Sequence, residues 1–146
     1  MIRLLAPAAL AALPLPAVPA HAQAAPPLTE LHIVAVSSAE QAERIAPGQR
    51  ETTRRHTGPV TIVVRGKGIG RARVVRMNGA LAMPPSTTRA LCGPAVTAGA
   101  CKPGAVTTGV ETTYHFGALP PGAVVTVQDT SANLPAATLI SEITIG

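Results

Sequence analysis

Cysteine is the residue type in this chain whose number and spacing point to a definite chemistry. The two cysteines are Cys92 and Cys101, and Gly93, Pro94 and Gly99 lie between them. In an exported chain, an even and minimal cysteine count indicates one disulfide. A thiolate metal site is the alternative, but it lacks a close Cys-x-x-Cys spacing and a third ligand nearby. We therefore predict a Cys92–Cys101 disulfide, which should stabilise the fold by about 2–3 kcal/mol.

The four histidines are scattered, and none is paired at a spacing typical of metal ligands. Solvated or capping histidines are the ordinary interpretation. Copper binding is the alternative: a leader cut after Ala20 would make His21 the amino terminus, whose amine and imidazole can chelate copper. Further ligands would be His32, His115 or methionine thioethers. Periplasmic copper carriers with immunoglobulin-like folds are similar in size, but this chain lacks their clustered His, Met and Asp ligands.

Residues that could catalyse hydrolysis have no visible partners in the sequence. No Gly-x-Ser-x-Gly motif is present, and the acids include no close pair apart from Glu40 and Glu43, which we expect to be solvated. The nucleophile–base signature of an enzyme is missing. A non-enzymatic protein is therefore the main prediction. A small secreted hydrolase stays as an alternative, and it requires a serine, a histidine and an acid to converge in space.

Basic residues are concentrated in one stretch of the chain. Of the 12 lysines and arginines, nine lie in a segment whose only acid is Glu51: Arg50, Arg54, Arg55, Arg65, Lys67, Arg71, Arg73, Arg76 and Arg89. This asymmetry predicts a basic face for an anionic envelope polymer, lipid headgroup or protein partner. The candidate contacts are Arg54, Arg55, Arg71 and Arg73. Solvated strand edges are the alternative, since positive charge discourages edge pairing. Export and the lack of interleaved aromatic residues argue against nucleic acid.

The first 22 residues predict an export signal. Arg3 precedes an apolar Ala/Leu stretch, and Ala20-His21-Ala22 has the small residues of a cleavage site, with Ala20, Ala22 or Ala24 as possible last residues. No later segment is long and apolar enough to span a bilayer. We expect a signal peptide at 1–22, a flexible lead-in at 23–30 and one domain at 31–146, located in the periplasm or secreted.

The elements that must position these residues are strands. Val, Ile, Leu and Ala provide the apolar residues, Trp is absent, and proline and glycine interrupt helices. Asn78-Gly79 predicts a type I′ hairpin, and a capping-box pattern at Ser38 predicts a short helix over 39–45. Gly66 to Gly70 predicts a strand connection rather than a phosphate loop, because no helix follows. Asp129 to Pro135 predicts a loop. The strands are expected at 31–36, 60–65, 74–77, 80–83, 110–116, 123–127 and 138–145, which indicates an antiparallel β-sandwich.

Two segments resemble the immunoglobulin-like domains of the IPT/TIG type. The first runs from Gly58 to Gly70 and is followed by a strand that ends at Asn78-Gly79, and the second is Leu119-Pro120-Pro121-Gly122 before Val124 to Val127. The resemblance covers about residues 45–146, and the cysteine loop departs from the usual pattern. It implies an immunoglobulin-like sandwich with an adhesion, ligand-binding or spacer role, and it carries over no functional residue. The combined prediction is an exported, non-enzymatic binding or structural module of the cell envelope.

Overall fold

The computed structural model describes residues 24–92 and 99–146, so the predicted signal peptide, with His21, lies outside the described residues. The described part is all-β, and the predicted disulfide joins Cys92 and Cys101 with a Cα–Cα distance of 4.9 Å. Its strands are β1 (Glu30–Ser37), β2 (Ala42–Arg44), β3 (Pro59–Lys67), β4 (Val74–Met77), β5 (Ala80–Ala82), β6 (Ser86–Cys92), β7 (Thr107–Ala118), β8 (Ala123–Thr130) and β9 (Thr138–Ile145). In this part of the chain, no helix is long and apolar enough to cross a membrane.

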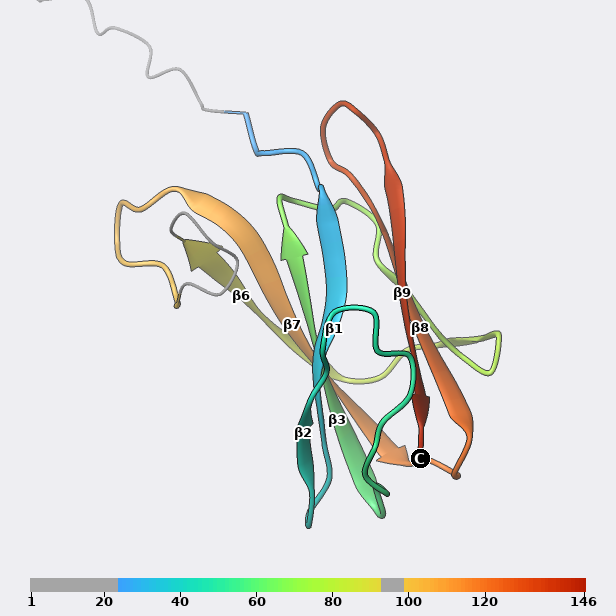
Figure 1. The fold of residues 1–146 in the computed structure, drawn as a ribbon. Coiled ribbons are helices and arrows are strands. Elements are labelled where there is room, and N and C mark those ends of the chain that lie inside the picture. The colour runs from blue at the N-terminus through green and yellow to red at the C-terminus, as the bar shows by residue number, and fades with distance from the viewer. Residues whose placement is uncertain (1–23, 93–98) are drawn as a thin grey trace, which may run out of the picture.

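The strands form two antiparallel sheets that pack face to face as a sandwich (Figure 1). One sheet has the order β2-β1-β3-β7-β6 and the other the order β5-β4-β8-β9. The predicted antiparallel β-sandwich with one disulfide is thus confirmed.

Alternation along the strands builds the core between the sheets. On β3, Val60, Ile62 and Val64 are each at most 1% exposed, while the residues between them are partly exposed. β-branched side chains suit this position because their restricted χ1 angles fit a pleated surface. Each such side chain contributes about 1.5–3 kcal/mol when buried. The core therefore forms almost entirely from aliphatic residues.

The Asn78-Gly79 turn has the predicted geometry. Both residues have positive φ, 49° and 81°, as a type I′ hairpin requires. The turn sets Met77 opposite Ala80, and the side-chain oxygen of Asn78 accepts a hydrogen bond from the backbone N–H of Val124 (2.8 Å). The hairpin is thereby fixed to the start of β8.

The helix predicted over 39–45 is wrong, because this segment contains β2. The backbone N–H of Ser38 donates to the carbonyl of Gln41 (2.8 Å), which closes a tight turn. Across this turn β1 pairs with β2, so that Val36 lies opposite Glu43. The Ser38 hydroxyl contacts His56 instead of capping a helix. Tertiary partners of Ser38 and Glu43 thus override the local capping pattern.

Two further differences from the prediction concern β8 and β6. Asp129 and Thr130 continue β8, although Asp129 was expected to begin a loop. β6 was not predicted at all, because Ser86 to Ala90 are all exposed and provide no apolar alternation.

The segment before β1 packs against the connection between β3 and β4. Leu28 is 2% exposed, and its backbone N–H donates to the Ser131 hydroxyl (2.9 Å). Gly68 has a φ of 87°, and a Cβ there would lie 1.9 Å from the carbonyl oxygen of Pro27. A strand connection is thus present, but it begins at Gly68 and not at Gly66 as predicted, because Gly66 and Lys67 still belong to β3. It leads the chain to Arg71 and Arg73.

Candidate functional site

A cleft of about 510 Å³ lies between β4–β5 of one sheet and β6–β7 of the other. It exists because β4 and β5 are short, with four and three residues, and leave the inward side of β6 uncovered. Its volume is within the range of small-ligand sites. The polar residues that line it are Arg71, Arg73, Ser86, Thr88, Thr112, Tyr114 and Asp129.

An ion pair between Arg73 and Asp129 lies in the wall of this cleft. The Nε and Nη2 atoms of Arg73 both lie 2.8 Å from Oδ2 of Asp129, and the two side chains are 16% and 2% exposed. Oδ1 of Asp129 is buried without a hydrogen-bond partner in the described structure. A buried acceptor without a donor is costly, so a ligand hydroxyl or ammonium group that entered the wall of the cleft would find an acceptor here, once the atoms that cover it moved aside.

Hydroxyl groups surround the ion pair. Nη1 of Arg73 donates to the hydroxyl of Thr112 (2.6 Å), which also contacts the hydroxyl of Thr88 (3.2 Å). Burial raises the pKa of Tyr114, against the opposing effect of the neighbouring Arg73 charge. Tyr114 therefore stays protonated at neutral pH. The cleft combines hydroxyls and one ion pair, which suits recognition of a polar group.

Apolar residues line the other side of the cleft. Leu81 on β5 and Met83 after it are 69% and 89% exposed, although both are large and apolar. Gly70 also lines the cleft and lies directly against Asp129, since a Cβ there would lie 2.2 Å from its carboxylate. A ligand in the cleft would thus meet an apolar rim and a polar floor.

The four predicted arginine contacts do not form one surface. Arg54 and Arg55 precede β3, whereas Arg71 and Arg73 follow it, and nine residues of strand span about 26 Å. Arg71 is exposed and lines the cleft. Arg73 is directed at Asp129 and is therefore mainly an internal partner. Only Arg71 of the four joins exposure to a place in the cleft.

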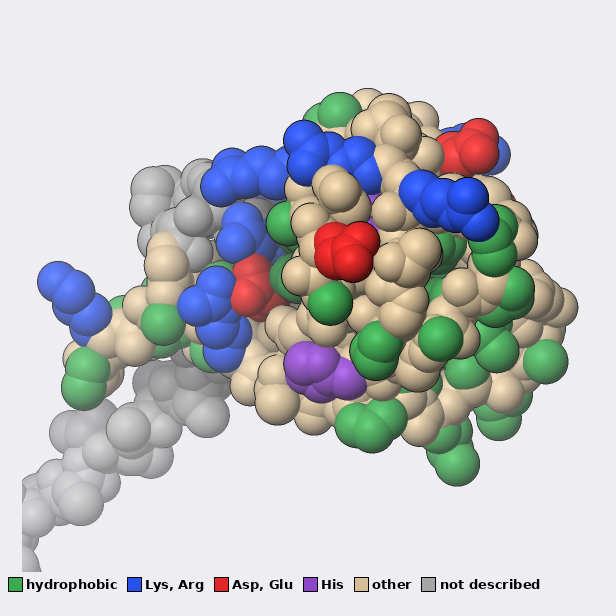
Figure 2. All heavy atoms as spheres, turned by 90° about the horizontal axis from the view of Figure 1, so that it is seen from below, with side chains coloured by type: hydrophobic (Ala, Val, Ile, Leu, Met, Phe, Trp, Pro, Cys, Tyr) green, Lys and Arg blue, Asp and Glu red, His purple; other side chains and the backbone are tan. Residues whose placement is uncertain are grey.

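Acids from the second half of the chain also pair with the basic stretch. Arg65 and Arg89 donate through Nε to the two oxygens of Glu111 (2.6 and 2.7 Å). Burial works to raise the pKa of Glu111, but the hydrogen bonds and charges of Arg89 and Arg65 lower it. In Figure 2, acidic side chains lie among the Lys and Arg side chains of the face seen from below. The charge asymmetry of the sequence is thus partly cancelled in space.

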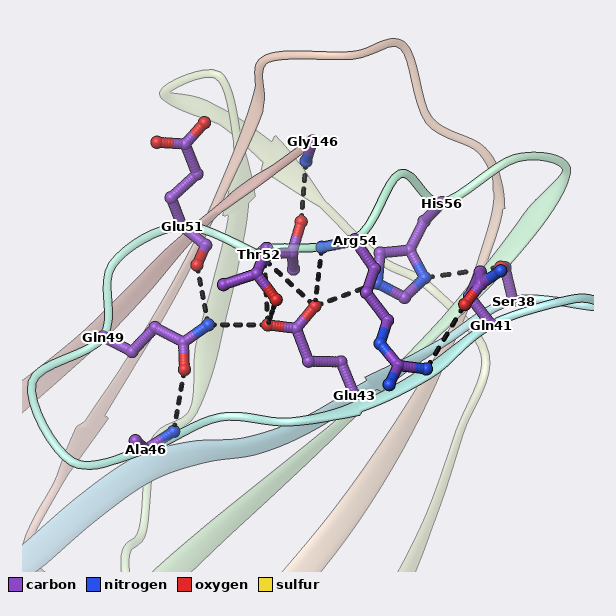
Figure 3. Close-up of polar contacts among 11 residues, drawn as sticks. Ser38, Gln41, Glu43, Ala46, Gln49, Glu51, Thr52, Arg54, His56 and Gly146 are labelled. Atoms are coloured by element: carbon purple, nitrogen blue, oxygen red, sulfur yellow. Dashed lines mark hydrogen bonds and ion pairs between the residues drawn. The ribbon is translucent and has the colours of Figure 1, made fainter.

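A second polar cluster joins Glu43, His56 and Ser38 (Figure 3). Nδ1 of His56 lies 3.3 Å from the Ser38 hydroxyl, and its Nε2 lies 3.8 Å from Oε2 of Glu43, beyond hydrogen-bond distance. The His56 side chain is fully buried and that of Glu43 is 7% exposed. Glu43 was expected to be solvated, and this expectation is wrong because the loop after β2 folds over it.

Hydrogen-bond donors from that loop satisfy Glu43. The backbone N–H groups of Thr53 and Arg54 donate to it at 2.9–3.0 Å, and Nε2 of Gln49 donates at 2.7 Å. Burial works to raise the pKa of Glu43, but these hydrogen bonds lower it to about 2. Glu43 therefore holds the loop in place as a carboxylate.

The histidines considered for copper lie apart. His32 on β1 lies opposite Arg65 of β3, and His115 on β7 lies opposite Thr61 of β3. Arg65 and Thr61 are four residues apart, which is about 13 Å along the strand. They cannot share one ion, since metal–nitrogen bonds are about 2 Å long. Among residues 24–92 and 99–146, no group of three His, Cys, Asp or Glu side chains could hold a metal ion. The copper alternative thus depends on His21, outside the described residues.

Sequence reasoning missed Asp129, Thr112 and Tyr114 as parts of one site. Thr112 and Tyr114 lie at alternating positions of the strand predicted over 110–116, and a polar threonine among alternating apolar residues was an available signal. Asp129 gave no such signal, because an acid followed by small polar residues also indicates a loop.

Comparison with known proteins gives a family for the chain. No curated protein and no solved structure matches it. One family matches residues 16–145, which is most of the chain, and its description is Domain of unknown function (DUF4879). The chain belongs to the DUF4879 family.

Proposed function

We propose that this protein is an exported, non-enzymatic binding module of the cell envelope that holds an anionic partner at the cleft between its sheets. The observation that carries this proposal is the polar cleft itself, with an unpartnered buried oxygen on Asp129 and the exposed Arg71 at its wall. Arg71 has no acidic partner within the described residues and supplies the positive charge. Asp129 supplies an acceptor for a hydroxyl or amine of the same ligand.

The proposed fold within the sandwich class is immunoglobulin-like. Without β2, the sheets have the orders β1-β3-β7-β6 and β5-β4-β8-β9. These orders correspond to strands A-B-E-D and C′-C-F-G of the immunoglobulin arrangement. The disulfide differs, because it closes the connection after β6 instead of linking the sheets. The strand order supports the IPT/TIG resemblance, and this fold commonly serves binding.

Tyr114 provides a direct test of the cleft. It is the only tyrosine, the chain has no tryptophan, and it lines the cleft, so its fluorescence should report occupancy. We expect dextran sulfate to change this fluorescence, with affinity falling steeply between about 10 mM and about 150 mM salt. Arg71→Ala should weaken binding about tenfold, as expected for a charged hydrogen bond of about 1.5 kcal/mol.

Arg50→Ala is the matched control, because it removes an exposed arginine outside the cleft. It should leave the affinity within about twofold, as expected for a distant screened charge. Equal losses in both variants, or binding that is independent of salt, would refute the proposal.

Hydrolysis is the second candidate, and the contact between Ser38 and His56 favours it. Against it, Glu43 does not hydrogen-bond His56, and Ser38 does not line the cleft between the sheets. A fluorophosphonate probe decides the question. Labelling that disappears in Ser38→Ala but persists in Ser37→Ala would establish a nucleophile, and an unlabelled wild-type protein would exclude a reactive serine.

A further inference from the structure

β6 is an edge strand that borders the cleft. It pairs with β7 on one side. On its other side, within the described residues, only its end is paired, where Leu91 forms an isolated antiparallel bridge with Ala100. Its residues from Ser86 to Ala90 are exposed. An edge of this kind presents backbone donors and acceptors that a further strand can use.

The direction of these backbone groups follows from the ladder with β7. The backbone N–H of His115 donates to the carbonyl of Pro85 (2.9 Å), and the register continues with Thr87 opposite Thr113 and Arg89 opposite Glu111. In an antiparallel pair, hydrogen-bonded positions alternate with positions that point away. Thr87 and Arg89 therefore bond to β7, while the N–H and C=O groups of Thr88 point to the open side. Those of Ala90 point the same way, next to the bridge between Leu91 and Ala100.

The two faces of β6 differ in chemistry. Thr88 lines the cleft and contacts Thr112, so its side chain faces inward. Arg89 lies on the opposite face, where it shares Glu111 with Arg65 and is 53% exposed. Two cations against one acid leave this outer row with a net positive charge. An added strand would thus meet the cleft on one face and a basic row on the other.

The other sheet edges are less suitable for pairing. β2 and β5 have only three residues each. β9 is partly covered, because Glu51 bridges to Thr144, and Thr144 donates its N–H to the carbonyl of Arg50. β6 is also bridged, but only at Leu91, by Ala100, so its residues from Ser86 to Ala90 are the long open edge of the described residues.

We propose that β6 accepts an extended peptide segment of another protein as an additional strand, with its apolar side chains in the cleft and acidic side chains beside Arg89. This rests on the proposed function and names the chemical class of the partner. Backbone hydrogen bonds would give affinity, and the alternating side chains would give specificity. Charge favours an acidic peptide over a second copy of β6, since a second copy would bring the Arg89 side chains of both copies together.

The test uses a short acetylated and amidated peptide that alternates valine and glutamate. We expect the peptide to slow hydrogen exchange at the N–H groups of Thr88 and Ala90. Those of Thr87 and Arg89 should change little, because β7 already protects them. A peptide with lysine in place of glutamate should bind at least tenfold more weakly.

Thr88→Pro is the informative variant. It removes an N–H that points to the open side, where proline is tolerated on an edge strand, so the fold should survive. Peptide binding should fall at least tenfold in Thr88→Pro and by clearly less in Thr88→Val, which keeps the N–H but loses the hydroxyl that lines the cleft. Urea unfolding of both variants checks that they are folded.

The outcomes separate this inference from the proposed function. Peptide binding that survives in folded Thr88→Pro, while dextran sulfate binding still needs Arg71, overturns strand addition and leaves the cleft proposal intact. Slow exchange at Thr88 and Ala90 without peptide, in a protein that sediments as a dimer, also overturns it. Loss of peptide binding in Thr88→Pro alone supports strand addition, even where dextran sulfate binding proves independent of Arg71.

Discussion

Glu43 and Asp129 are both buried carboxylates, but their surroundings differ. Glu43 accepts hydrogen bonds from the backbone and side chains of one loop, and both of its oxygens are occupied. Asp129 receives a guanidinium on Oδ2, and its Oδ1 has no partner in the described residues. Each carboxylate has lost contact with water on folding, and this loss is costly for any oxygen that gains no hydrogen-bond donor in exchange.

The difference separates a structural role from a binding role. Neutral donors close in sequence satisfy Glu43 and so tie the 49–54 loop to β2. Asp129 depends on Arg73, whose own donors also reach Thr112 on the opposite sheet. The first arrangement is complete in itself, whereas the second leaves an acceptor at the cleft. This is why we assign the ligand to the cleft and the loop anchor to Glu43.

The largest expected effect comes from breaking the Arg73–Asp129 pair. Asp129→Leu should lower the free energy of unfolding by about 3–5 kcal/mol, because it leaves the guanidinium largely buried without a counter-charge. The double variant Arg73→Met/Asp129→Leu should lose less than Asp129→Leu alone, since no unpaired charge remains. Urea unfolding measures both.

Glu30→Gln is the matched control for that experiment. It weakens the exposed ion pair between Glu30 and Lys67 (3.3 Å), so it should cost under about 1 kcal/mol. If Asp129→Leu costs no more than this control, Asp129 is not the buried charge that the structure describes.

The next effect concerns Glu43 and pH. Its pKa in the folded protein, about 2, is below its ordinary value of 4.5. Its stabilising contribution is therefore complete above pH 4.5 and is lost as pH falls toward 2. We expect Glu43→Gln to cost about 2 kcal/mol at neutral pH, after allowance for solvent near the loop. Wild type and variant should converge in stability as the pH falls, and parallel profiles would contradict the assignment.

The smallest effect concerns Tyr114. Burial raises its pKa above 10.0, and the charge of Arg73 opposes this rise. Ultraviolet absorbance can follow its ionisation, since the chain has one tyrosine and no tryptophan. We expect a midpoint above 10.0 in the wild type and a still higher one in Arg73→Met. A midpoint that does not move in Arg73→Met would show that the guanidinium does not act on the cleft.

Much of the fold was predictable because its causes are local. The alternation in β3, the β-branched residues of β8 and the Asn78-Gly79 turn act within a few residues, so they indicate strands and hairpins directly. The cysteine pair was predictable because its alternatives were few. β6 escaped prediction because an edge strand exposed on both faces lacks an apolar pattern.

The sequence by itself therefore determined an aliphatic, antiparallel sandwich with one disulfide. Only the tertiary structure decided which charges meet. It joined Arg73 to Asp129 and Arg65 to Glu111 from distant parts of the chain, and it divided the basic stretch between two ends of β3. The physical reason is that ion pairing, burial and an open sheet edge depend on strand order, and strand order results from long-range packing that no local pattern records.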